Sequence, residues 1–130
     1  MWFDESVHEA WLEAVRSAIE DAGYKAIRID KIEHNNRIDD EIVAAIRSCN
    51  FLVADFTGQR GGVYFEAGFA QGLGKQVIWL CREDELSNVH FDTRQYNYIK
   101  WQPSELHQLR IALRNRITAT IGKGTFPKAV

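Results

Sequence analysis

The stretch that decides the fold runs from Phe51 to Leu80 and reads FLVADFTGQRGGVYFEAGFAQGLGKQVIWL. It begins with a continuous apolar run, Phe51–Ala54, and ends with another, Gln76–Leu80. Such runs are typical of strands covered on both faces, as in parallel sheets. Between them, the glycine-containing segment 58–62 interrupts regular structure, and residues 63–73 predict a helix. The stretch therefore predicts a strand, a loop, a helix and a second, parallel strand.

Strands and helices also alternate outside this stretch. Lys25–Ile29 alternates as a strand does, and Tyr96–Trp101 predicts a weaker strand. Helical spacing of apolar residues predicts a helix at 6–22, a second around Ile42 and a last one that begins at Pro103. The side chains expected to be buried are Val7, Trp11, Leu12, Val15 and Ile19 in the first helix, Ile38, Ile42, Val43 and Ile46 in the second, and Leu106, Leu109, Leu113, Ile117 and Ile121 in the last.

This order predicts a single α/β domain over residues 1–130, Rossmann-like or flavodoxin-like. It would have three layers and a mainly parallel sheet of about five strands. The apolar stretch before the first predicted helix is only Met1-Trp2-Phe3, and this stretch is too short for a full strand. Either the sheet lacks a normal first strand or the chain begins inside one. We expect the second, with a short or truncated first strand and Met1 an internal methionine of a longer protein.

Composition narrows the class of protein. The 130 residues are 45% hydrophobic and 26% charged, which is ordinary globular usage and excludes disordered and collagen-like chains. The longest apolar run, Val77–Cys81, is too short to cross a bilayer, and no signal peptide opens the chain. Cys49 and Cys81 both lie in apolar stretches and are expected to be reduced thiols. We therefore expect a cytoplasmic protein that does not bind membranes.

The basic residues near the end of the chain do not predict nucleic-acid binding. Net charge is −2, yet residues 100–130 hold six basic groups and one acidic group. Arg110, Arg114 and Arg116 recur along the last predicted helix, where a solvated helical face explains them better than a phosphate-binding surface. No nucleic-acid motif accompanies them.

Ligands of open α/β sheets bind beyond the carboxyl ends of the strands. The candidate binding residues that follow the predicted strands are Asp4, Ser6, Asp30, Asp55 and Thr57. The connection after Ala54 is the richest in chemistry, because Gly61 and Gly62 let the backbone come close to a ligand. The helix that follows directs free amides and the positive end of its dipole toward this place.

Glu66 is the candidate nucleophile or base in this connection. We expect it in about the first turn of the helix, where the dipole favours its ionised form. The alternative is that Glu66 merely complements the helix dipole, as many glutamates do. Spacing alone does not decide between these two roles.

The segment Val53-Ala-Asp-Phe-Thr57, followed by Gly62-Val-Tyr-Phe-Glu-Ala-Gly-Phe-Ala70 and Gly74-Lys-Gln-Val-Ile78, resembles the signature of the nucleoside 2-deoxyribosyltransferase family. That family includes deoxyribosyltransferases and deoxynucleotide N-glycosidases. Weaker similarity extends from the Phe3 to Ser6 opening through Ile38-Asp-Asp-Glu-Ile42, so that the resemblance covers over half of the chain.

The resemblance implies a role for each matching residue. Glu66 would attack the anomeric carbon of a nucleoside and form a glycosyl ester, which water or a second base would then attack. Asp55 would orient Glu66 or bind the leaving base, and Asp39 or Asp40 would protonate the leaving group. Phe3 would contact the substrate. Relatives complete their sites with neighbouring subunits, which implies a homo-oligomer.

The chain departs from the family in two places. Gln59-Arg60-Gly61 stands where relatives often carry a small hydroxyl or an acidic residue. Arg60 therefore favours a phosphate or another anion over a neutral nucleoside, and Arg37 could also reach a phosphate. The loop from His90 to Asn97 also differs, and its side chains would form either a structural network or a lid over the ligand. The candidate contacts in that loop are Asp92, Arg94 and Gln95.

Three functions follow from these observations. The first is cleavage or transfer of an N-glycosidic bond of a nucleoside or nucleotide, with Glu66 as nucleophile. The second is a TIR-like domain that splits nicotinamide from NAD through a glutamate. The third is a nucleotide-sensing or assembly module of a larger protein, without turnover. We expect no cofactor and no metal, because the four histidines are far apart and no Walker A or Gly-x-Gly-x-x-Gly motif is present.

Overall fold

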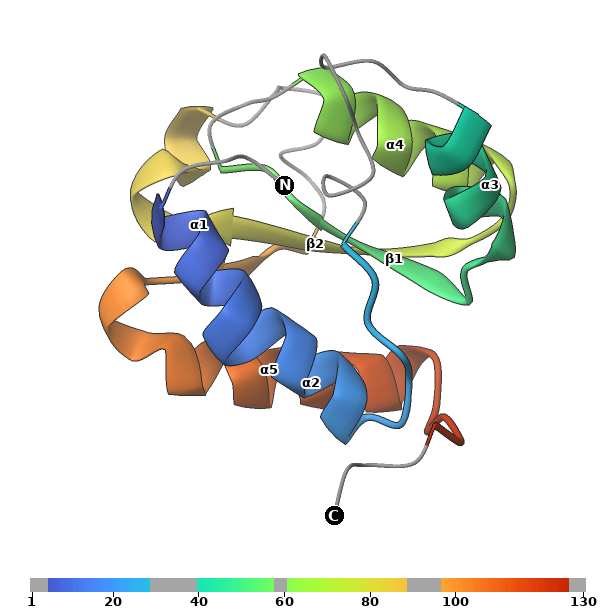
Figure 1. The fold of residues 1–130 in the computed structure, drawn as a ribbon. Helices are drawn as coiled ribbons and strands as arrows, with labels where there is room; N and C mark the ends of the chain where they lie inside the picture. Colours follow the sequence, from blue (N-terminus) through green and yellow to red (C-terminus); the bar gives the residue numbers. More distant parts are fainter. Residues whose placement is uncertain (1–4, 29–39, 58–60, 89–96, 127–130) are drawn as a thin grey trace.

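The computed structural model describes residues 5–28, 40–57, 61–88 and 97–126, and its strands form one open sheet (Figure 1). β1 (Phe51–Asp55), β2 (Gln76–Arg82) and β3 (Ile99–Trp101) are parallel and lie in the order β1-β2-β3. Phe51 lies opposite Gln76, and Leu80 lies opposite Ile99. The two continuous apolar runs therefore form neighbouring parallel strands, as predicted.

One helical run precedes the sheet and contains a π-helical turn. It consists of α1 (Glu5–Ala10), the π-helical turn η1 (Trp11–Val15) and α2 (Arg16–Asp21). Gly23 follows with a φ of 94°, a conformation that favours glycine and ends the helix. Leu12 was expected to be buried and is 45% exposed, since alanines fill the centre of the buried stripe and leave Leu12 at its edge. These alanines are Ala10, Ala14, Ala18 and Ala22.

The other helices surround the strands. α3 (Asp40–Ser48) precedes β1, and α4 (Gly61–Gly72) follows it. A 3-10 helix, η3 (Glu83–Asn88), begins the connection after β2. A 3-10 turn, η5 (Pro103–Glu105), leads into α5 (Leu106–Thr120), as the proline predicted.

Helices cover both faces of the sheet, so the described part of the chain has three layers (Figure 1). The helical run 5–21 and α5 pack on one face, against side chains that include Phe51, Val53, Leu80 and Trp101. α3 and α4 pack on the other face, against the side chains of Leu52, Ala54, Val77 and Trp79. Alternate residues of β1 thus face opposite layers, as the pleat of a strand requires. The arrangement is α/β and compatible with a Rossmann-like fold.

The expected sheet of about five strands is wrong for the described residues, which form three. Lys25–Arg28, the described part of the predicted strand Lys25–Ile29, has no regular secondary structure. The reason is geometric, because a cavity separates this segment from β1 and the two backbones form no ladder of hydrogen bonds. The expected first strand at Met1–Phe3 lies outside the described residues.

Candidate functional site

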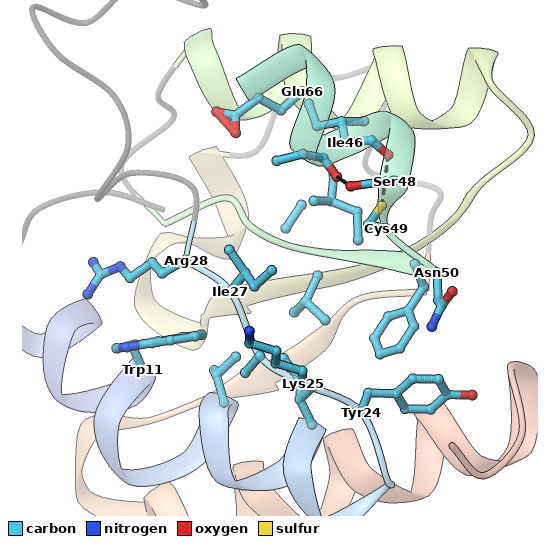
Figure 2. Close-up of a pocket in the computed structure, with 18 of the residues that line it drawn as sticks. Trp11, Tyr24, Lys25, Ile27, Arg28, Ile46, Ser48, Cys49, Asn50 and Glu66 are labelled. Carbon is cyan, nitrogen blue, oxygen red and sulfur yellow. Dashed lines mark hydrogen bonds between the residues drawn. The ribbon is translucent and has the colours of Figure 1, made fainter. Parts of the chain in front are cut away.

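A cavity of about 250 Å³ lies beside β1, and no residue of β2 lines it (Figure 2). The helical run 5–21 and the segment Tyr24–Arg28 form one side of its wall. The end of α3, the residues that follow it and the start of α4 form the other side. The cavity therefore lies at the level of the sheet, between the two helical layers.

Among the predicted site residues whose side chains the structure describes, Glu66 lines this cavity. Its side chain is half-buried, and Figure 2 shows it at the opposite end of the cavity from Asn50. Because α4 begins at Gly61, Glu66 is its sixth residue and lies in the second turn, not the first. The helix dipole acts on Glu66 less strongly than the sequence predicted, since its effect falls off within one turn.

Arg28 lines the same cavity, and Figure 2 shows it at the same end as Glu66. It is only 8% exposed. Its Nη1 donates a hydrogen bond of 2.9 Å to His8 Nδ1, and its guanidinium lies 5.9 Å from the centre of the Trp11 ring. Sequence reasoning missed Arg28, although a charged residue at the carboxyl end of a predicted strand was a usable signal.

Asp55 does not meet Glu66. The pleat of β1 directs Asp55 to the same face as Val53, whereas α4 packs on the other face. Asp55 Oδ1 accepts a 2.8 Å hydrogen bond from the Thr57 amide, and Oδ2 accepts a 2.8 Å bond from Trp101 Nε1. Burial raises the pKa of Asp55, and these hydrogen bonds act in the opposite direction. Asp55 thus belongs to a buried junction that links the carboxyl end of β1 to Trp101 of β3, across β2.

Thr57 belongs to the same buried junction. Its Oγ1 accepts a 2.8 Å hydrogen bond from the backbone amide of Arg82, at the end of β2. Thr57 is fully buried and does not line the cavity. Together, Asp55 and Thr57 link the carboxyl ends of the three described strands through hydrogen bonds. Both residues therefore stabilise the sheet beside the cavity without lining the cavity.

The remaining predicted residues fall into two groups. Asp40 is exposed at the start of α3 and does not line the cavity, Gly61 and Gly62 form the first turn of α4, and Ser6 is in α1. The others lie outside the described residues, and they are Phe3, Asp4, Asp30, Arg37, Asp39, Arg60, Asp92, Arg94 and Gln95.

The described residues offer few candidates for metal binding or for a reactive thiol. Within the described ranges, no three His, Cys, Asp or Glu side chains are grouped so that they could hold a metal ion. Cys49 and Cys81 are both free, and burial raises the pKa of Cys81 to about 12. A thiol with so high a pKa is almost entirely protonated at neutral pH and is a poor nucleophile.

Of the helices that the structure describes, none has the length and apolar character to span a membrane.

No protein-family model, curated protein or solved structure matches the chain. The resemblance to deoxyribosyltransferases therefore remains a hypothesis that rests on the motif around Glu66.

Proposed function

We propose that this domain binds a nucleoside or nucleotide beside Glu66 and cleaves or transfers its N-glycosidic bond. The observation that carries the proposal is the position of Glu66 in the wall of a cavity of about 250 Å³. Ligand pockets commonly measure about 300–1,000 Å³, so this cavity suits a sugar with part of a base better than a whole dinucleotide. Its size therefore favours a nucleoside or mononucleotide over NAD.

Glu66 supplies the nucleophile in this proposal. A carboxylate oxygen of Glu66 forms a bond to the anomeric carbon while the bond between that carbon and the base nitrogen breaks. The electron pair of the broken bond leaves with the base. The base takes up a proton from water at the mouth of the cavity. Water then attacks the ester, releasing the sugar and restoring the carboxylate, or a second base attacks it and a new nucleoside forms. Asp55 and Asp40 do not line the cavity, and we assign neither of them a direct contact with the sugar.

Arg28 supports a substrate with a negative charge. Its guanidinium is fixed against Trp11 and His8 at the Glu66 end of the cavity. A positive charge in a mostly buried place attracts a phosphate more strongly than the same charge in water would. We therefore propose that nucleoside monophosphates are better substrates than nucleosides.

A chromatographic assay tests the proposal. The full chain is incubated with deoxynucleosides, their monophosphates and NAD in separate samples, and free base or nicotinamide is measured over time. We expect release of a nucleobase, faster from a monophosphate than from its nucleoside. Release of nicotinamide alone would favour the NAD-cleaving alternative. Saturable nucleotide binding by calorimetry without any product would favour the sensing module, and absence of both would refute all three.

A further inference from the structure

Two residues of the helical run 5–21, His8 and Trp11, hold the side chain of Arg28. Arg28 Nη1 donates a 2.9 Å hydrogen bond to His8 Nδ1, and the guanidinium carbon lies 5.9 Å from the centre of the Trp11 ring. His8 and Trp11 are three residues apart, and residues with this spacing are neighbours on the surface of a helix. Arg28 itself lies in a segment without regular secondary structure, so these contacts help to fix the direction of its side chain.

The hydrogen bond from Arg28 also defines the protonation of His8. A guanidinium has donors but no acceptor, so His8 Nδ1 must be the acceptor. A ring nitrogen accepts only when it carries no proton, so this imidazole is neutral and its single proton lies on Nε2. The imidazole therefore orients the guanidinium without adding a negative charge. A carboxylate in the same place would compete with an anionic ligand for Arg28.

The backbone that carries His8 is rigid, although the side chain of His8 is exposed. Val7 and Ala10 are fully buried and Trp11 is 6% exposed, so the core fixes the helix on both sides of His8. The π-helical turn η1 begins at Trp11, and such turns are rare and frequent at functional sites. A ligand that meets Arg28 thus meets a guanidinium that is already oriented, which lowers the entropic cost of binding.

We propose that His8 is a positioning residue, which holds Arg28 at the Glu66 end of the cavity so that the guanidinium binds the phosphate of the substrate (Figure 2). This inference rests on the proposed function, because it assigns the phosphate subsite of the same cavity. Guanidinium donors match two phosphate oxygens at once, and a fixed side chain presents both donors to one phosphate. His8 does not line the cavity, so it acts only through Arg28.

Binding of inorganic phosphate tests this proposal without catalysis. Phosphate is titrated into the full chain and binding is measured by calorimetry. His8→Phe keeps a ring but removes the acceptor, so the dissociation constant should rise roughly tenfold or more. His8→Asn places an amide oxygen near the position of Nδ1 and should restore the dissociation constant to within about threefold of the wild type. Phenylalanine and asparagine form helix about as well as histidine, so these variants should fold alike.

Two more variants locate the effect. Arg28→Met removes the guanidinium and should abolish phosphate binding. His107→Phe makes the same replacement on α5, at an exposed position that does not line the cavity, and it should bind phosphate as the wild type does. Circular dichroism verifies the fold of each variant.

Kinetics and NMR distinguish positioning from a loss of structure. With a deoxynucleoside monophosphate, His8→Phe should raise KM roughly tenfold or more with little change in kcat, and His8→Asn should reverse the increase. The effect on KM for the matching nucleoside should be smaller, because it has no phosphate for Arg28 to bind. Nitrogen NMR should show an unprotonated Nδ1 in His8, with a signal that shifts in Arg28→Met.

Four results would overturn the role of His8. The wild type binds no phosphate, His8→Phe binds it as tightly as the wild type, His8→Asn fails to restore binding, or NMR finds the proton on Nδ1. Glu66→Gln should still bind phosphate, because it keeps Arg28 and His8. Phosphate binding that meets these expectations without release of any base would refute the proposed enzyme and leave the phosphate subsite standing.

Discussion

Replacing Glu66 by glutamine should reduce the rate of base release on the order of 10³-fold or more, because the amide keeps the shape of the side chain but cannot form the glycosyl ester. Glu66 is half-buried in the second turn of α4, and glutamine forms helix about as well as glutamate. The variant should therefore stay folded. The measurement is the initial rate of base release, with circular dichroism to verify the fold.

Glu105→Gln is the matched control for this variant. Glu105 is an exposed carboxylate in η5 and does not line the cavity, so its rate should equal that of the wild type. Full activity in a correctly folded Glu66→Gln protein would exclude Glu66 as the nucleophile. Equal loss in both variants would point to a general effect of charge, which also contradicts the proposed role.

Asp55→Ala should lower the free energy of unfolding by about 3 kcal/mol or more, because it leaves the Thr57 amide and Trp101 Nε1 without their acceptor in the interior. Guanidinium denaturation measures this loss. Asp84→Ala is the control, because Asp84 pairs with Arg82 at 2.6 Å but is largely exposed, and its removal should cost less than about 1 kcal/mol.

The role of Asp55 also has a pH signature. Burial raises the pKa of Asp55 above the ordinary 3.8, while hydrogen bonds from Thr57 and Trp101 act against the shift. The folded protein then holds the proton of Asp55 more strongly than the unfolded chain does. The stability that this proton provides is complete below pH 3.8 and is lost as pH rises through the folded pKa. Asp55→Asn should lack this decline, and a wild type that gains stability relative to Asp55→Asn over the same range would contradict the account.

Activity distinguishes a structural Asp55 from a catalytic one. If Asp55 acts only on the fold, Asp55→Asn should retain base release within about tenfold at temperatures where it is folded. A folded Asp55→Asn protein with as little activity as Glu66→Gln would restore the catalytic role that the family resemblance implies for Asp55.

Local chemistry made several elements predictable. β1 and β2 are covered on both faces, which requires continuous apolar runs, and these runs are visible in the sequence. Gly23 and Pro103 mark the end of one helix and the start of another through their own backbone preferences. Such signals depend on neighbouring residues only, so a single sequence suffices to find them.

The remaining features depend on contacts between distant parts of the chain. The resemblance implied a catalytic role for Asp55, which ends a strand. Its hydrogen-bond partner Trp101 is 46 residues away, and no local pattern in the sequence predicts that bond. Lys25–Ile29 alternates between polar and apolar residues as a strand does. Its described part, Lys25–Arg28, lies across a cavity from β1, and an alternating pattern cannot show whether a neighbouring strand is present. The position of Arg28 at the candidate site depends on its hydrogen bond to His8 and its contact with the Trp11 ring, and both partners belong to the helical run 5–21.

A crystal structure of Glu66→Gln with a substrate that the wild type cleaves tests the central claim most directly. The variant should hold the intact substrate, because it lacks the nucleophile. We predict that the sugar occupies the Glu66 end of the cavity, with its anomeric carbon about 3–3.5 Å from the side-chain oxygen of residue 66. A substrate bound elsewhere on the protein, or one whose anomeric carbon faces away from residue 66, would contradict the account.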